Sequence, residues 1–246
     1  MYEKNKGRNK VKITTILFDL DGTLLPMDQD VFIGAYFGGL AKKLVPHGYD
    51  DKEKLFGAIW SGTRAMVKNT GDKVNEEAFW EEFCRIFGEK AREDIDLFDE
   101  FYANDFCKVK DACGYNSKAA DTIRTIKSLG FRVALATNPL FPSTATEQRI
   151  SWTGLSHTDF EHFTTYENSH FCKPNLDYYR EVMGKLGVCA EECLMVGNDV
   201  SEDMIAEILG SKVFLLTDCL INKDNKDISA YPQGSFDELL AYVKPL

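Results

Sequence analysis

The chain has 246 residues, enough for one large domain or for a core with an inserted subdomain. Its content of 44% hydrophobic and 28% charged residues is ordinary for a globular protein. The formal net charge of −10 argues against a nucleic-acid partner, because binding a phosphate backbone requires a basic surface. The basic start, from Lys4 to Lys12, precedes only a short apolar run. We therefore expect no signal peptide and no membrane span, and a cytoplasmic protein.

The cysteines give no sign of a disulfide framework or of a zinc site. There are seven of them, scattered through the chain, which favours reduced thiols. Cys189 and Cys193, or His170 and Cys172, have the spacing of half a zinc site. Neither pair has a second pair at the usual spacing, so we do not predict zinc.

One apolar strand opens the chain, and a long helical stretch follows it. Residues 13–18 form an apolar, β-branched run that predicts a buried strand. From residue 26 to residue 107, apolar residues recur at helical spacing and no strand is indicated. We therefore predict a helical bundle over residues 26–107.

After residue 108, predicted strands and helices alternate. Strands are predicted at residues 131–136, 160–166, 193–196 and 212–216. Helices are predicted at residues 117–129, 143–152, 175–186, 201–209 and 236–243. This alternation predicts a parallel sheet covered by helices on both faces, an α/β doubly wound fold. The α/β core would then comprise residues 1–25 and 108–246, with the helical bundle inserted between them.

Two carboxylates follow the first predicted strand. Asp19 and Asp21 are two residues apart, so in an extended chain they point to the same side. Gly22 permits a turn directly after them, and Thr23 adds a hydroxyl. Carboxylates this close repel each other unless a cation lies between them or one is protonated. The pattern therefore fits a Mg²⁺ site with a nucleophilic and an acid/base carboxylate, although a plain Asp-Gly turn is also common.

More polar residues lie at the ends of later strands or just before helices. They are Thr137, Asn138, Lys173, Asp199 and Asp203. Taken singly, each is more often a turn, a solvated lysine or a helix entry. Together they point to one crevice, because the carboxyl ends of parallel strands converge there. Carboxylates suit Mg²⁺, and the hydroxyl, amide and ammonium groups suit a phosphoryl group, so phosphoryl transfer is indicated.

In these motifs the chain resembles the haloacid dehalogenase-like hydrolase superfamily, and within it the phosphatase branch. Asp19–Thr23 reads D-L-D-G-T, and Thr137 stands at the family's second motif. Lys173, followed by proline, stands at the third motif, and residues 197–203 at the acidic fourth. The fourth motif has Asn198 where many relatives have an acidic residue. The resemblance extends from residue 14 to about residue 216.

The resemblance implies roles for the first motif. Asp19 would attack phosphorus and become an aspartyl-phosphate. Asp21 would protonate the leaving alcohol and then take a proton from the hydrolytic water. Mg²⁺ would be held by Asp19, by the backbone carbonyl of Asp21 and by Asp199. Relatives that cleave carbon–halogen bonds lack an equivalent of Asp21, so its presence favours phosphate chemistry.

The resemblance also implies how the phosphoryl group is bound. Thr137, Asn138 and Lys173 would bind its oxygens, and Lys173 would also serve catalysis. Asp203 would orient Lys173 or a metal-bound water from behind.

The helical insertion resembles the family's mobile cap, which excludes water and contacts the leaving group. Only 35 residues lie between Thr137 and Lys173, too few for the large alternative cap. Trp60 and Arg64 are one helical turn apart and are candidates to face the cleft. An exposed arginine beside a core tryptophan is, however, the more common arrangement.

The sequence thus predicts a Mg²⁺-dependent phosphatase that removes phosphate from a small phosphorylated metabolite. A phosphomutase of the same fold and a non-catalytic binding protein remain open as alternatives. Which metabolite is bound, and the oligomeric state, are not indicated by the sequence.

Overall fold

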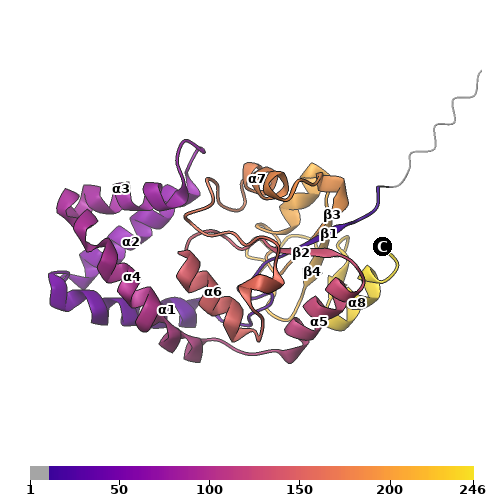
Figure 1. Cartoon of the computed structure of the whole chain (residues 1–246), viewed down its shortest axis with the longest axis horizontal. Helices are drawn as coiled ribbons and strands as arrows, with labels where there is room; N and C mark the ends of the chain where they lie inside the picture. The colour runs from indigo at the N-terminus through magenta and orange to yellow at the C-terminus, as the bar shows by residue number, and fades with distance from the viewer. Residues whose placement is uncertain (1–10) are drawn as a thin grey trace, which may run out of the picture.

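The computed structural model describes residues 11–246, and within them it contains a five-stranded sheet in the order β2-β1-β3-β4-β5 (Figure 1). All neighbouring strands are parallel. The strands are β1 (Thr15–Phe18), β2 (Arg132–Leu135), β3 (Cys193–Gly197), β4 (Lys212–Leu216) and β5 (Gln233–Gly234). The predicted α/β fold with a parallel sheet is confirmed.

The α-helices fall into an inserted group and a group around the sheet. The inserted group is α1 (Gln29–Leu44), α2 (Lys52–Val67), α3 (Asn75–Phe87) and α4 (Ile95–Asn104). The others are α5 (Ser117–Ser128), α6 (Ser143–Trp152), α7 (Leu176–Leu186) and α8 (Phe236–Val243). Short 3₁₀ helices are η1 (Val45–His47), η2 (Glu89–Asp94), η3 (Phe106–Ala112), η4 (His157–Asp159), η5 (Ala190–Glu192) and η6 (Met204–Leu209).

Alternate residues of each strand pack on opposite faces of the sheet, as the two-residue period of a strand requires. Ile16 and Phe18 of β1 belong to the hydrophobic core that includes Ile123 of α5. Leu17 of β1 belongs to the second core, which includes Tyr178 of α7. Helices therefore cover both faces, and the sheet is buried on each side.

The connections leave the sheet in opposite directions on either side of β1 and β3. β1 leads to β2 on one side, and β3 leads to β4 on the other. This makes the gap between the carboxyl ends of β1 and β3 the switch point, where ligands bind in open α/β sheets.

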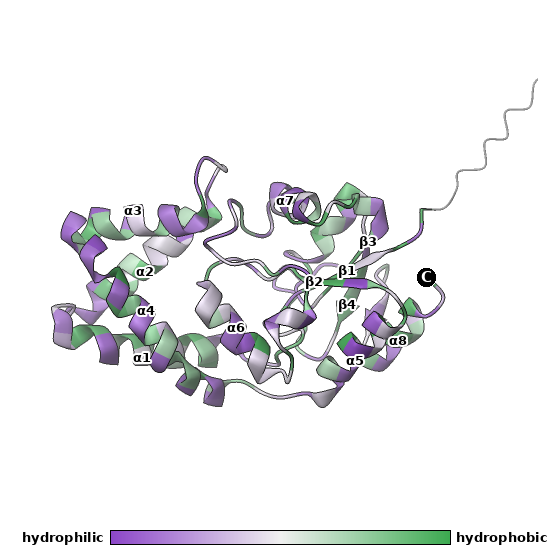
Figure 2. Ribbon diagram, in the orientation of Figure 1, coloured by the Kyte–Doolittle hydropathy of each residue, from purple (hydrophilic) through white to green (hydrophobic). Residues whose placement is uncertain are grey.

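The helices α1–α4 gather beyond the carboxyl ends of the strands (Figure 1). Figure 2 shows these helices banded with both hydrophilic and hydrophobic residues, which is typical of helices with one buried face. Gly62 of α2 permits a close approach to α3, since a Cβ there would stand 2.5 Å from the Phe79 ring.

The inserted group leaves and rejoins the core at one place. Met27 forms an isolated antiparallel bridge with Cys113, and the Gly114 amide donates to the Pro26 carbonyl over 2.7 Å. The group also contacts the core at the start of α3, where the amide of Asn75 donates to the Ser169 carbonyl over 2.8 Å. That residues 26–107 act as a mobile cap stays a prediction.

Two predicted elements are wrong. Residues 160–166 form no strand: Phe163 makes a single bridge to Leu135, and the segment then turns away. Hydrogen bonds turn the segment away from the sheet, because the Thr164 hydroxyl donates to the distant Thr137 carbonyl and the Thr165 amide donates to the Asn168 side chain.

Residues 201–209 are not an α-helix that begins at Ser201. A turn precedes the 3₁₀ helix η6, because Asp199 rather than Ser201 accepts the first free amides. None of the described helices has the length and apolar character needed to cross a membrane.

Candidate functional site

The register of the sheet places three of the predicted motifs at one level. Phe18 of β1 is paired with Leu135 of β2 and with Val196 of β3. Asp19 therefore follows β1 at the height at which Thr137 follows β2 and Asp199 follows β3. The switch point of the sheet lies between the ends of β1 and β3, so the strand pairing itself gathers these residues at one site.

The turn after Asp19 requires glycine. The Gly22 amide donates to the Leu25 carbonyl over 2.8 Å, which folds the chain back directly after the two carboxylates. Gly22 has a φ of 84°, and a Cβ there would stand 2.3 Å from Nδ2 of Asn198. Both the left-handed conformation and the close approach of β3's loop exclude a side chain at this position.

Lys173 is the buried cation of the site and is 1% exposed. Its Nζ donates to Oδ1 of Asp19 over 2.8 Å and to Oδ1 of Asp203 over 2.6 Å. Burial alone would lower the pKa of Lys173, but the two carboxylates outweigh it and raise this pKa well above its usual value. The ammonium group therefore stays charged beside the Asp19 carboxylate.

Asp203 links Lys173 to the end of β3. Its Oδ2 accepts the Asp199 amide over 2.9 Å, and its Oδ1 accepts Lys173. Burial raises the pKa of Asp203 to about 6, although Lys173 opposes the rise. Gly197 is required here, since a Cβ would stand 2.1 Å from Oδ2 of Asp203.

Thr137 and Asn138 lie at the end of β2. The Thr137 hydroxyl makes no hydrogen bond with any described residue, while its carbonyl accepts Tyr178 over 2.8 Å. Asn138 is engaged on both sides: its Oδ1 accepts the Lys173 amide over 3.3 Å, and its Nδ2 donates to Oε2 of Glu202 over 3.1 Å. The Thr137 hydroxyl is thus free to bind a ligand, whereas the Asn138 side chain is already hydrogen-bonded to Lys173 and Glu202.

Asp21 points away from Lys173 and pairs with Arg149 of α6, a side chain that is 1% exposed. Burial raises the pKa of Asp21, and the Arg149 guanidinium opposes the rise. The Oδ1 atom of Asp21 has no hydrogen-bond partner among the described residues. That oxygen is buried, so Asp21 holds an unpaired acceptor beside its contact with Arg149.

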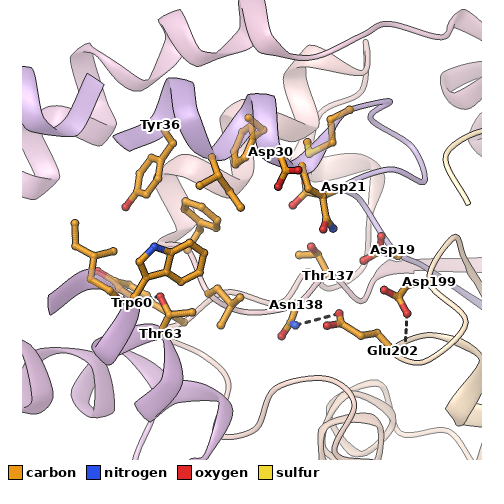
Figure 3. Close-up of a pocket in the computed structure, with 18 of the residues that line it drawn as sticks. Asp19, Asp21, Asp30, Tyr36, Trp60, Thr63, Thr137, Asn138, Asp199 and Glu202 are labelled. Atoms are coloured by element: carbon orange, nitrogen blue, oxygen red, sulfur yellow. Dashed lines mark hydrogen bonds between the residues drawn. The ribbon is translucent and has the colours of Figure 1, made fainter. Parts of the chain in front are cut away.

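A cavity of about 410 Å³ begins at these residues and extends into the inserted helices. Figure 3 shows Asp19, Thr137, Asn138, Asp199 and Glu202 around one end, with Tyr36, Trp60 and Thr63 at the other. The strand ends thus supply the charged half of the cavity, and the helices supply the remainder.

Two carboxylates of this site fit a divalent cation. Asp19 and Asp199 follow adjacent strands and line the same cavity. Oδ1 of Asp199 accepts the amides of Ser201 over 2.7 Å and of Glu202 over 2.9 Å, which leaves its Oδ2 free of donors from the described residues. No three His, Cys, Asp or Glu side chains converge into a complete metal site anywhere in residues 11–246. The two carboxylates, as hard oxygen ligands, fit Mg²⁺, which takes few carboxylates and completes its shell with carbonyl, water and substrate oxygens.

Sequence reasoning missed Glu202 and Arg149 at the site, and it placed Asn198 in the fourth motif without predicting a contact for it. Glu202 contacts Asn138, and burial raises its pKa to about 7. Asn198 accepts the Thr23 hydroxyl over 2.8 Å. Arg149 had a usable signal, because it lies four and three residues after Ala145 and Thr146, on the buried face of α6. A charged residue on a buried helix face, soon after the second motif, indicates a buried partner.

Comparisons with solved structures show the same fold. A HAD phosphatase from Thermococcus onnurineus matches with a TM-score of 0.58 at 18% identity, covering 94% of this chain and 98% of that one. A 2-haloacid dehalogenase from Pseudomonas syringae pv. Tomato DC3000 matches with a TM-score of 0.62 at 17% identity, covering 94% and 97%. The HAD-hydrolase YfnB from Bacillus subtilis, bound to magnesium, matches with a TM-score of 0.55 at 19% identity, covering 96% and 100%.

These likenesses concern the fold, and they include both phosphatases and dehalogenases. A search of curated proteins gave no match. The family model for haloacid dehalogenase-like hydrolases, in contrast, matches residues 13–206, which include all four motifs. The chain belongs to the haloacid dehalogenase-like hydrolase family.

Proposed function

We propose that this hydrolase is a Mg²⁺-dependent phosphatase that acts on a small phosphomonoester through an aspartyl-phosphate. One observation carries the proposal: the Lys173 ammonium lies 2.8 Å from the Asp19 carboxylate, at the end of the cavity lined by Thr137 and Asp199. A carboxylate repels an incoming phosphoryl group, and a fixed cation beside it lowers that repulsion.

In the first step, an oxygen of Asp19 attacks phosphorus, and the bond from phosphorus to the leaving oxygen breaks. Asp21 gives its proton to that oxygen, so the product leaves as an alcohol. In the second step, water attacks the aspartyl-phosphate and Asp21 takes a proton from it. Inorganic phosphate leaves, and Asp19 is restored as a carboxylate.

Lys173 and the Thr137 hydroxyl would bind phosphoryl oxygens during both steps. The Asp19 and Asp199 carboxylates and the Asp21 carbonyl would hold Mg²⁺. The bound ion supplies positive charge that offsets the charge on the phosphoryl oxygens. Asp203 holds the Lys173 ammonium against Asp19 and so fixes the direction of its hydrogen bonds.

Asp21 supports phosphate chemistry over carbon–halogen cleavage. A halide leaves without a proton, whereas an alkoxide needs one. The raised pKa of Asp21 and the unpartnered Oδ1 atom suit a group that donates a proton to the leaving oxygen.

We further propose that α1–α4 close over the substrate as a cap. The cytoplasmic location stays a prediction.

The test is phosphate release from 4-nitrophenyl phosphate by the full chain, with and without Mg²⁺. We expect Mg²⁺-dependent release that Asp19→Asn abolishes. Asp121→Asn is the matched control, because this aspartate lies on the exposed surface of α5 and its side chain is 73% exposed. Undiminished turnover by Asp19→Asn would refute the proposal.

The rival functions have their own products. Chloride release from 2-chloropropionate, without phosphate release from any ester, would establish a dehalogenase instead. Conversion of a hexose 1-phosphate to its 6-phosphate, without free phosphate, would establish a phosphomutase. No turnover of any of these compounds would leave a binding protein.

A further inference from the structure

The part of the cavity away from the strand ends is walled by aromatic rings. They come from the four inserted helices and from the loop after β2: Tyr36, Phe37, Trp60, Phe79, Tyr102 and Phe141. The Phe141 ring meets the Tyr36 ring edge-on at 5.2 Å between centroids, so core and insertion form one continuous wall. Such a surface offers stacking and apolar contact rather than hydrogen bonds.

Most polar groups on this wall are paired within the protein. The Tyr36 and Tyr102 hydroxyls bond to each other over 2.8 Å, and the Thr63 hydroxyl donates to the Ile59 carbonyl over 2.9 Å. The indole Nε1 of Trp80, which also lines the cavity, has no partner among the described residues. A sugar bound here would lose hydrogen bonds to water for several hydroxyls and find few replacements, so a mainly apolar wall selects against a polyol.

Charge excludes a second anionic group on the substrate. Among the described residues that line the cavity, the acids are Asp19, Asp21, Asp30, Asp199, Glu202 and Asp203, and the one cation is Lys223. Lys223 lies on the exposed surface near the strand ends, and Lys173 is held by Asp19 and Asp203. Arg64, a sequence candidate to face the cleft, is exposed and does not line the cavity. The Arg149 guanidinium lies 4.5 Å from the centroid of the Phe141 ring, but it is paired with Asp21. The cations near the cavity are thus held by carboxylates or, like Lys223, lie away from the aromatic wall, so a carboxylate or a second phosphate would find no unpaired cation there.

We propose that the substrate is the monophosphate ester of an uncharged, largely apolar alcohol that carries an aromatic ring. The inference rests on the proposed phosphatase function. The phosphoryl group lies at Asp19, the ester oxygen beside Asp21, and the ring against Tyr36 and Trp60 (Figure 3). Phe79 also lines this part of the cavity. The cavity volume of about 410 Å³ has room for a ring of this kind.

The test compares esters whose leaving groups are all alkyl alcohols, so that leaving-group acidity does not decide the result. 2-Phenylethyl phosphate is set against glucose 6-phosphate, phosphoglycolate and phosphocholine, with Mg²⁺ present. We expect kcat/KM for 2-phenylethyl phosphate to exceed each of the others by about tenfold or more. A higher kcat/KM for the sugar, the dianionic acid or the cationic ester overturns the inference.

A variant of the wall adds a second readout. Trp60 is 42% exposed, so Trp60→Ala removes a ring from the wall without emptying a buried core. We expect it to raise KM for 2-phenylethyl phosphate by about tenfold, and to leave hydrolysis of acetyl phosphate, which does not reach the wall, unchanged. Equal effects on both substrates contradict the proposed contact.

The exposed aromatic Tyr115 is the matched control. It is 64% exposed and does not line the cavity, so Tyr115→Ala should alter neither substrate. Acetyl phosphate also separates the two proposals. If it is hydrolysed in an Asp19-dependent way while the sugar ester is preferred, the phosphatase stands and the substrate class fails. If no phosphate is released from any compound, both fail.

Discussion

Replacing Lys173 by methionine tests how the site is held together. The variant keeps most of the side-chain volume but leaves the Asp19 and Asp203 carboxylates facing each other without their cation. Each contact, at 2.8 Å and 2.6 Å, contributes about 6 kcal/mol of attraction at an effective dielectric constant of about 20. Much of this offsets the cost of dehydrating three charges.

Removing one partner of such a buried group nevertheless destabilises a protein by about 3–5 kcal/mol, because the remaining charges stay buried. For a chain of this size, that corresponds to a fall of about 6–20 °C in Tm. The measurement is thermal unfolding followed by circular dichroism at pH 7, with EDTA present so that no metal compensates the carboxylates.

Two further variants make the result specific. Lys108→Met removes a lysine whose side chain is 70% exposed and paired with Asp105 on the surface, so its Tm should change little. The double variant Lys173→Met/Asp203→Asn removes one of the two opposed carboxylates and should recover part of the loss. A Lys173→Met protein with the Tm of the parent would refute the reasoning that Lys173 neutralises a buried pair.

The other predictions concern the turn, the arginine and the metal. Gly22→Ala should lose about 1–3 kcal/mol of stability from its left-handed conformation and lose activity as well, because its Cβ meets Asn198. Gly48 has a similar φ of 97°, but a Cβ there would meet no atom within 4 Å, so Gly48→Ala is the control. Urea unfolding of both variants then separates the contact with Asn198 from the backbone strain, and equal losses of stability would contradict the contact. Arg149→Met should lower kcat about tenfold or more, because Asp21 loses the partner that holds it in place. Arg149→Lys should recover part of the lost kcat. Steady-state kinetics that show a change in KM alone would contradict this role. Removal of Mg²⁺ by EDTA should abolish phosphate release, and re-addition of Mg²⁺ should restore it. Full activity in EDTA would exclude the proposed metal site.

The sequence was most informative where a single local pattern decides the structure. The strand over residues 13–18, the alternation after residue 108 and the helical character of residues 26–107 follow from apolar periodicity, which reflects burial. Three of the four motifs could be placed at strand ends, because parallel strands in such folds present their carboxyl ends together. The pairing of Phe18 with Leu135 and Val196 places the ends of β1, β2 and β3 side by side. This alignment arises from contacts between strands, so it cannot be predicted from any one segment of the sequence.

What escaped prediction depends on distant partners. The segment over residues 160–166 has the composition of a strand, but the Thr164 hydroxyl turns to the Thr137 carbonyl and ends the pairing. Asp199 rather than Ser201 accepts the first amide of the turn before η6. Asp203, in the same turn, pairs with Lys173, which is 30 residues away in the sequence. Likewise, Arg149 and Asp21 are far apart in sequence, and their pairing depends on how α6 lies against the turn after β1.

The bridge between Met27 and Cys113 places the two ends of the helical insertion beside each other. The insertion thus starts and ends at one place beside the sheet, although the start of α3 and the Tyr36 ring also contact the core. A different insertion could occupy the same attachment without altering the pairing of β1 with its neighbours. The residues at the strand ends and most rings of the aromatic wall therefore belong to separate segments of the chain, and the segment between residues 27 and 113 can change while the strand ends stay in place.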